Sequence, residues 1–93
     1  MTKQEKLYLR NVAALGCAAC RRIGINDSPC EIHHIREGRL GKRSDHMDAI
    51  PLCPRHHRNG NEALHVMGKR AWERHFGFTE FDLLEDVKRM MNG

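Results

Sequence analysis

Residues 50–57 read Ile-Pro-Leu-Cys-Pro-Arg-His-His, and this stretch decides the fold because it joins a short apolar strand to a helix start that carries metal ligands. Cys53 and His56 stand three positions apart, the same spacing as Cys17 and Cys20 earlier in the chain. Two ligands separated by two residues turn toward one point, so the two pairs together predict a Cys3His zinc tetrahedron. Such a site is closed, and it supplies folding free energy rather than chemistry.

The remaining histidines predict a second metal site, because imidazole suits both a catalytic divalent ion and a general base. The main candidates are His33, His34 and His57, with His46 and His65 in reserve. Successive side chains on a helix diverge by about 100°, so His56 can complete the zinc tetrahedron while its neighbour His57 faces another site. The tandem pair can therefore serve two ions.

His33 and His34 are harder to place together. Consecutive side chains on a regular strand point to opposite faces and could not both reach one ion. Either the strand ends there, or one of the two histidines is structural. Gly38 and Gly41 follow shortly afterwards and favour an early strand end.

The run Glu-Ile-His-His-Ile-Arg at residues 31–36 and the run Ile-Pro-Leu-Cys at residues 50–53, followed by His56 and His57, resemble the HNH nucleases. Within that family these runs are most similar to phage proteins of the recombination enhancement function (Ref) type. The resemblance covers about residues 17–59 and implies an α+β fold. Its core would be a small ββα-metal (HNH, His-Me finger) motif with a zinc knuckle and flanking helices.

The resemblance also implies residue roles when it is carried over position by position. His33 and His57 become ligands of the catalytic ion, and His34 becomes the general base. The structural zinc positions fall on Cys17, Cys20, Cys53 and His56. The middle Asn of the motif falls on Asp48, which when ionised only accepts hydrogen bonds where Asn also donates. Asp48 is therefore a candidate for a helper carboxylate near the metal.

The activity that this resemblance implies is metal-dependent DNA endonuclease, linked to phage DNA recombination or processing. Neutral His34 would take a proton from water while Mg²⁺ or Mn²⁺ polarises the phosphate of the scissile phosphodiester. An alternative of another class stays open: a zinc-stabilised nucleic-acid-binding module without catalysis, which needs only the knuckle and the positive charge. A thiol oxidoreductase using Cys17 and Cys20 is disfavoured because the chain lacks the βαβ context of that motif.

The charge distribution favours DNA as the partner. The formal net charge is +4 with neutral histidines, which suits nucleic acid. Basic residues crowd the loop between the two expected strands, where we expect the phosphate backbone to bind: Arg36, Arg39, Lys42 and Arg43. A solvated basic loop is the alternative. A recombinase filament is the less expected partner, because the long basic N-terminal segment of Ref proteins is not in this sequence, and the oligomeric state is open.

The 93 residues predict a single domain, with the core motif at about 17–59 and a helical C-terminal part at about 62–92. Only 5% of residues are aromatic, so a metal staple would supplement a modest core. Residues 1–6 are polar and no apolar stretch is long enough to span a bilayer, so we expect no membrane partner and a cytoplasmic location. If the chain is encoded by a phage or prophage, as the resemblance implies, that cytoplasm is a bacterial host's. There, cysteine thiolates on zinc are favoured over disulfides.

Caps and periodicity place the other elements. Thr2 and Glu5 form a capping box for a helix that ends near Gly16. Its expected buried side consists of Leu7, Asn11, Ala14 and Leu15. Strands are expected around residues 30–34 and 49–52, and a helix from Pro54.

The C-terminal third predicts two more helices. The first covers about residues 62–75 with a break at Gly68, and Gly77 closes it. Thr79 caps the second, whose apolar side consists of Leu83, Leu84, Val87, Met90 and Met91. We expect the aromatic residues Trp72, Phe76, Phe78 and Phe81 in the core, and Cys30 as a buried free thiol.

Overall fold

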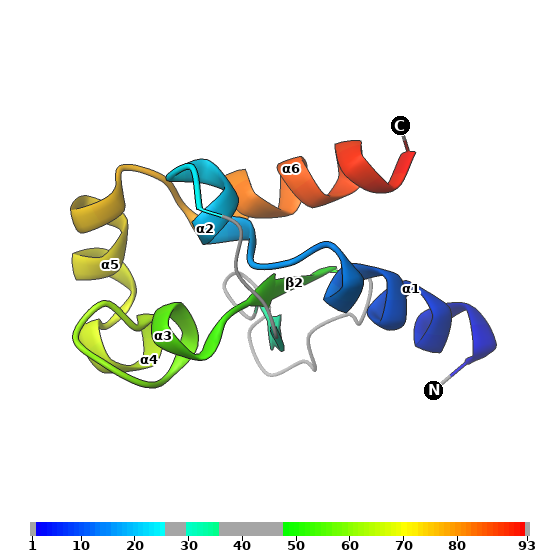
Figure 1. Cartoon of the computed structure of the whole chain (residues 1–93), viewed down its shortest axis with the longest axis horizontal. Helices are drawn as coiled ribbons and strands as arrows, with labels where there is room; N and C mark the ends of the chain where they lie inside the picture. The colour runs from blue at the N-terminus through cyan, green and yellow to red at the C-terminus, as the bar shows by residue number, and fades with distance from the viewer. Residues whose placement is uncertain (1, 26–29, 36–47, 93) are drawn as a thin grey trace.

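The computed structural model describes residues 2–25, 30–35 and 48–92, and these form an α+β fold, as predicted. The elements in chain order are α1 (Lys3–Ala14), α2 (Ala18–Arg22), β1 (Glu31–His34), β2 (Ala49–Leu52), α3 (Pro54–His57), α4 (Leu64–Met67), α5 (Lys69–Phe76) and α6 (Glu80–Asn92) (Figure 1). The elements β1, β2 and α3 follow one another in the predicted strand, strand, helix order.

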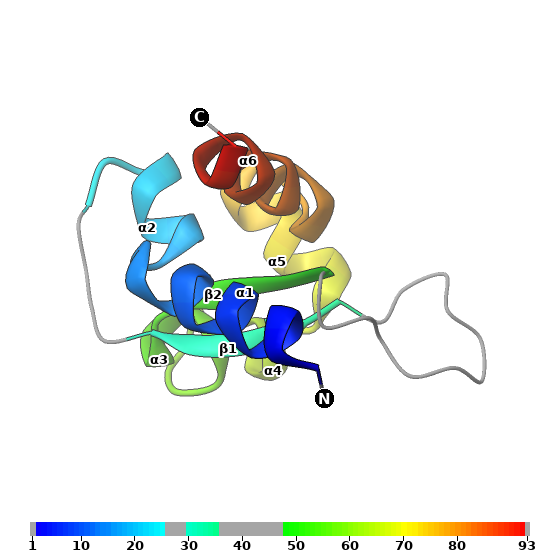
Figure 2. The same ribbon diagram turned by 90° about the vertical axis from the view of Figure 1, so that its right-hand side faces the viewer.

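The two strands form an antiparallel sheet at the centre of the molecule. Glu31 lies opposite Leu52, and His34 lies opposite Ala49. Every residue of β2 is buried, because α1, α2 and α6 all contact this strand. In both views α6 lies on the upper side of the sheet, and α3 and α4 lie on the lower side (Figures 1 and 2). The short sheet is therefore covered by helices on both sides.

Both predicted capping residues have the geometry of capping boxes. The Thr2 hydroxyl accepts from the Glu5 amide at 3.1 Å, and the Glu5 carboxylate accepts from the Thr2 amide at 2.8 Å. Thr79 and Asp82 repeat this exchange at 3.1 and 2.8 Å at the start of α6. Each exchange satisfies amide groups that a helix start leaves unpaired. These short-range patterns therefore predict both helix starts correctly.

The buried face of α1 differs from the prediction. The predicted buried side was wrong for Leu7, Asn11 and Ala14, which are exposed. Tyr8 and Val12 are the buried residues of this helix. The Tyr8 hydroxyl donates to the Ala49 carbonyl at 3.2 Å, and this contact with β2 turns the Tyr8 face inward. The weak apolar stripe of the helix did not reveal an anchor that depends on tertiary contact.

Glycine positions divide the C-terminal region as predicted. Gly68 has φ of 85° between α4 and α5, and Gly77 adopts the left-handed conformation that ends α5. Along α6, Leu83 and Val87 are buried, and the remaining members of the predicted apolar side pack against the core: Leu84, Met90 and Met91. This region therefore brings α6 back over the sheet.

The aromatic core is smaller than predicted. Trp72 and Phe78 are buried, and Phe76 is half-buried against them. The core assignment was wrong for Phe81, which is 44% exposed. Phe81 lies in the first turn of α6 away from the buried face, and the Lys69 ammonium lies 5.5 Å from the centre of its ring. A cation over an aromatic face stabilises such a half-exposed ring.

Candidate metal centres

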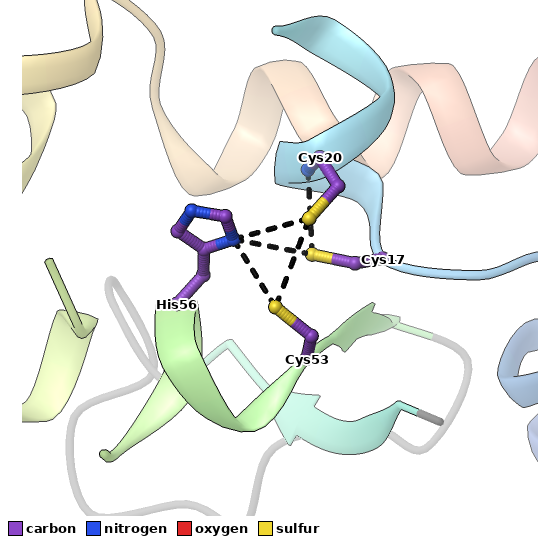
Figure 3. A group of neighbouring side chains, drawn as sticks. All are labelled: Cys17, Cys20, Cys53 and His56. Carbon is purple, nitrogen blue, oxygen red and sulfur yellow. Dashed lines mark hydrogen bonds between the residues drawn. The ribbon is translucent and has the colours of Figure 1, made fainter. Parts of the chain in front are cut away.

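The four predicted zinc ligands converge in the structure (Figure 3). The Sγ atoms of Cys20 and Cys53 are 3.7 Å apart. The Nδ1 atom of His56 is 3.2 Å from Sγ of Cys53, 3.3 Å from Sγ of Cys20 and 3.7 Å from Sγ of Cys17. A tetrahedral zinc with bonds of about 2.3 Å to sulfur separates two sulfurs by about 3.8 Å, and sulfur from nitrogen by about 3.5 Å. These spacings mean that the cluster could hold a metal such as zinc.

Local backbone structure explains why these ligands meet. Cys17 is the N-cap of α2, and its Sγ accepts from the Cys20 amide at 3.4 Å. Cys53 is the N-cap of α3, with Pro54 at the first helical position, and its carbonyl accepts from the His56 amide at 3.0 Å. Each pair thus combines a helix N-cap with a residue one turn later. Two short helices position all four ligands.

Burial makes this cluster dependent on a cation. All four side chains are at most 1% exposed. Burial is the main cause that raises the pKa of the Cys20 thiol, and the neighbouring Cys17 raises it further. Burial also raises the pKa of the Cys17 thiol. Thiolates at these positions therefore require a positive charge at the centre of the cluster, which a bound metal would supply.

A second cluster joins three histidines from different elements. His33 of β1, His57 of α3 and His65 of α4 each offer a ring nitrogen, and these nitrogens lie within 4.8 Å of one another. The Nε2 atoms of His57 and His65 are 3.1 Å apart. Adjacent ligands of an octahedral ion with bonds of about 2.1 Å lie about 3.0 Å apart. The structure therefore brings the reserve residue His65 together with the two predicted ligands.

Carboxylates hold two of these rings, and the sequence interpretation missed both. Oε1 of Glu31 is 2.7 Å from Nδ1 of His57, and Oε2 of Glu80 contacts Nε2 of His33. A carboxylate only accepts, so Nδ1 of His57 carries the proton and Nε2 is left for an ion. Burial lowers the pKa of His57, and the hydrogen bond to Glu31 opposes that effect. Desolvation also lowers the pKa of His65, and both shifts favour the neutral imidazole that a metal needs.

A pocket of about 760 Å³ opens beside this three-histidine cluster. Its walls include His33, His57 and His65, and also His34. His33 and His34 are the last two residues of β1, where they lie opposite Ile50 and Ala49, and both line the pocket. His34 is half-buried in the pocket wall, where a water molecule and a phosphate could reach it.

Residues 1–92 of the 93-residue chain match a protein-family model described as "recombination enhancement, RecA-dependent nuclease". The chain belongs to this family. The match agrees with the Ref-type resemblance of the sequence and points to a nuclease that acts on nucleic acid. A search for similar curated proteins gave no match.

In this member of the RecA-dependent nuclease family, several predicted site residues fall elsewhere. Asp48 is half-buried and is not part of the described pocket wall. Cys30, predicted as a buried thiol, is half-buried and outside both clusters. The remaining predicted residues lie outside the described part of the chain: Arg36, Arg39, Lys42, Arg43 and His46. No helix among the described residues is long and apolar enough to cross a membrane.

The two missed carboxylates differ in how far the sequence could have revealed them. Glu31 stands two positions before His33 on the same strand, and residues i and i+2 share a face of a strand. That spacing was available as a signal. Glu80 lies 47 positions from His33 and opens a helix in another part of the chain. Only the folded arrangement could show its contact.

Proposed function

We propose that this chain is a single-domain, metal-dependent DNA endonuclease of the HNH type, and that the recombination named in the family description is its setting in phage DNA processing. The observation that carries the proposal is the convergence of His33, His57 and His65 on a pocket that His34 also lines. The family match supports the coarser part of it, because that family is described as nucleases. The ββα order of the elements around the pocket supports the HNH type.

The donor set of the pocket fits a divalent cation. His33 and His57 would hold it, joined by His65, and the ion would polarise the scissile phosphate and stabilise the leaving oxygen. An imidazole-rich site suits a softer ion than Mg²⁺, so of the two proposed ions Mn²⁺ fits better. Zinc in the Cys3His cluster would stabilise the fold, because that cluster is buried and its residues are not part of the wall of the described pocket.

His34 is the proposed general base. It lines the pocket and is outside the three-histidine cluster, which places its imidazole beside the proposed ion, where it would take a proton from the attacking water. A neutral imidazole with an ordinary pKa of about 6.5 can do this at physiological pH. No protein nucleophile is required.

Positive charge at the pocket would bind the DNA backbone. Arg58 and Lys69 both line the pocket, and the Arg58 side chain is 61% exposed. The exposed Arg58 side chain would contact a phosphate next to the scissile bond, and Lys69 would add positive charge to the pocket wall. The predicted basic residues Arg36, Arg39, Lys42 and Arg43 follow β1 in the sequence and would add to phosphate binding, although they lie outside the described residues.

A recombinase filament is part of the proposal as a partner to test. The family description includes RecA dependence, which favours DNA coated by RecA as a substrate form. The sequence interpretation ranked this partner low, so cleavage has to be compared on naked DNA and on RecA-coated DNA. Either substrate is compatible with a pocket that contacts phosphates rather than bases.

Plasmid cleavage tests the proposal. Purified protein with added Mg²⁺ or Mn²⁺ should nick or cut naked or RecA-coated plasmid, and His34→Ala should slow the cleavage step by about 10²- to 10⁴-fold, as loss of a general base does. His75→Ala is the matched control because His75 is an exposed histidine on α5, outside the pocket wall. Equal rates for wild type and His34→Ala would remove His34 as the base. DNA binding without cleavage on either substrate would favour the non-catalytic binding module.

A further inference from the structure

The carboxylate of Glu80 is buried in the wall of the same pocket. Glu80 is the first residue of α6 and is 5% exposed. One of its oxygens contacts Nε2 of His33, and the other is 3.6 Å from Nζ of Lys69. A buried carboxylate is costly unless it is paired and hydrogen-bonded, and here both oxygens have cationic or donating neighbours. The position of this charge therefore requires a reason beyond packing.

The contact with His33 selects one tautomer of the imidazole. Because an ionised carboxylate only accepts, the proton of neutral His33 lies on Nε2, and Nδ1 keeps its lone pair. In His57 the arrangement is reversed, since Glu31 holds Nδ1 and Nε2 faces His65. Two carboxylates thus fix two rings through opposite nitrogens. Each leaves one lone pair for an ion.

We propose that Glu80 is a positioning residue of the pocket, which holds His33 in the Nε2-protonated tautomer and so prepares Nδ1 to bind a divalent cation. The inference rests on the proposed function only in taking the three-histidine cluster as a metal site. It makes α6 part of the site, although α6 contributes no metal ligand. The Lys69 ammonium lies near the second oxygen of the Glu80 carboxylate and offsets its negative charge.

Metal affinity tests the inference directly. Titration calorimetry of zinc-loaded protein with Mn²⁺ should show binding about 10- to 100-fold weaker in Glu80→Ala, the usual loss when the carboxylate partner of a ligand histidine is removed. Glu80→Gln should lose less, because its amide oxygen can still accept from Nε2–H. Glu85→Gln, an exposed position on the same helix, should bind Mn²⁺ like the wild type.

A spectroscopic measurement separates positioning from a purely structural role. Imidazole ¹H–¹⁵N correlation spectra are recorded on protein that has zinc in the Cys3His cluster but no Mn²⁺ in the three-histidine cluster. They should show His33 as the Nε2–H tautomer in the wild type and a mixture of tautomers in Glu80→Ala. If Glu80→Ala does not fold, Glu80→Gln carries both measurements, because it keeps the side-chain volume and removes the charge. Mn²⁺ affinity within twofold of wild type in the folded variants, or an unchanged tautomer in Glu80→Ala, would overturn the inference.

These readouts also separate the inference from the endonuclease proposal. Wild-type protein that binds Mn²⁺ in a Glu80-dependent way but leaves DNA intact would support the positioning role and contradict the enzyme. DNA cleavage by a protein whose Mn²⁺ affinity does not depend on Glu80 would support the enzyme and contradict the positioning role. Absence of Mn²⁺ binding by the wild type would overturn the positioning role.

Discussion

The Cys3His cluster and the three-histidine cluster lie close in sequence but differ in surroundings. The ligands of the first are at most 1% exposed, and three of the four are sulfurs. The second contains the exposed His65, opens to a pocket and is held by two carboxylates. A closed, sulfur-rich site suits a permanent structural ion, whereas an open imidazole site leaves coordination positions for water and substrate.

The tandem pair His56 and His57 shows how one helix serves both. Both are buried on α3, yet His56 directs Nδ1 to the cysteines while His57 faces His65. Residue type alone therefore does not determine which cluster a histidine joins. Successive helical positions are rotated by about 100°, and this rotation directs His56 to the Cys3His cluster and His57 to the three-histidine cluster. Variants of each region should therefore fail in different ways.

The largest effect is expected in the Cys3His cluster. Structural zinc contributes an apparent 10–16 kcal/mol in small domains, roughly the whole 5–15 kcal/mol stability of a typical protein. Cys17→Ser should therefore abolish cooperative unfolding or lower the melting temperature drastically, as read by circular dichroism. Strong chelators should do the same to the wild type.

Cys30→Ser is the matched control for that prediction, because Cys30 is a half-buried cysteine outside the cluster. It should keep one zinc per chain and nearly wild-type melting. If Cys17→Ser melts like Cys30→Ser, the closed cluster does not stabilise the fold, and the contrast between the two regions fails.

The second-largest effect is expected at His57, which follows the predicted zinc ligand His56 on the same helical turn of α3. His57→Ala should keep the zinc and the fold but lower the cleavage rate at least about 10²-fold. The alanine side chain has no nitrogen that could bind the catalytic ion. Glu31, its partner, is 38% exposed and can be solvated once the ring is gone. Zinc content by elemental analysis and plasmid cleavage by single-turnover kinetics measure the two properties.

His56→Ala is the comparison for His57→Ala. It should lose zinc and unfold, since His56 is 1% exposed and contacts all three sulfurs. If both variants lost zinc equally, or if His57→Ala cleaved DNA at the wild-type rate, the division of the tandem pair would be wrong.

Local chemistry in the sequence predicted much of this molecule. The strand β2, the helix start at Pro54, the two capping boxes and the break at Gly68 all depend on residues within a few positions of one another. The four cysteine and histidine ligands were also predictable, because their spacing repeats. Short-range patterns of this kind fix backbone geometry before tertiary contacts form.

Features that depend on tertiary contacts could not be predicted in this way. The buried face of α1 follows from the bond between Tyr8 and the Ala49 carbonyl, 41 positions away. Glu80 reaches His33 only because α6 returns over the sheet. The membership of His65 in the histidine cluster depends on the turn between α3 and α4. A single sequence contains no local pattern for any of these contacts.

A smaller effect is expected for the positive charge at the pocket. Arg58→Ala should weaken DNA binding several-fold and reduce the salt slope of log K by about 1, because one phosphate contact is lost. Metal content should not change, since Arg58 is in neither cluster. Fluorescence anisotropy at several salt concentrations measures the slope.

Arg10→Ala controls for net charge, because Arg10 is exposed on α1 and is outside the pocket wall. Its salt slope should stay near that of the wild type. An unchanged slope in Arg58→Ala would show that the open region binds DNA without this residue.

The smallest effect concerns the connection between the two regions. Arg22 on α2, the helix that carries Cys20, donates to both oxygens of Asp86 on α6, the helix that carries Glu80, at 2.7 and 3.1 Å. Asp86→Asn should lower the free energy of unfolding by roughly 0.2–1 kcal/mol, the range for a pair at the surface. The deficit should shrink in about 1 M NaCl because salt screens exposed charges.

The pH dependence of that deficit gives a sharper test. The Arg22 guanidinium lowers the pKa of Asp86 below its ordinary value of 3.8, so the carboxylate stabilises the fold above that value and the effect is lost only as pH falls through the lowered pKa. Between about pH 5.5 and pH 8 the difference between wild type and Asp86→Asn should therefore be constant, with Glu85→Gln as the charge-matched control. Urea unfolding at both pH values measures it. A deficit that vanishes by pH 5.5 would contradict the lowered pKa of Asp86 and the ion pair that causes it.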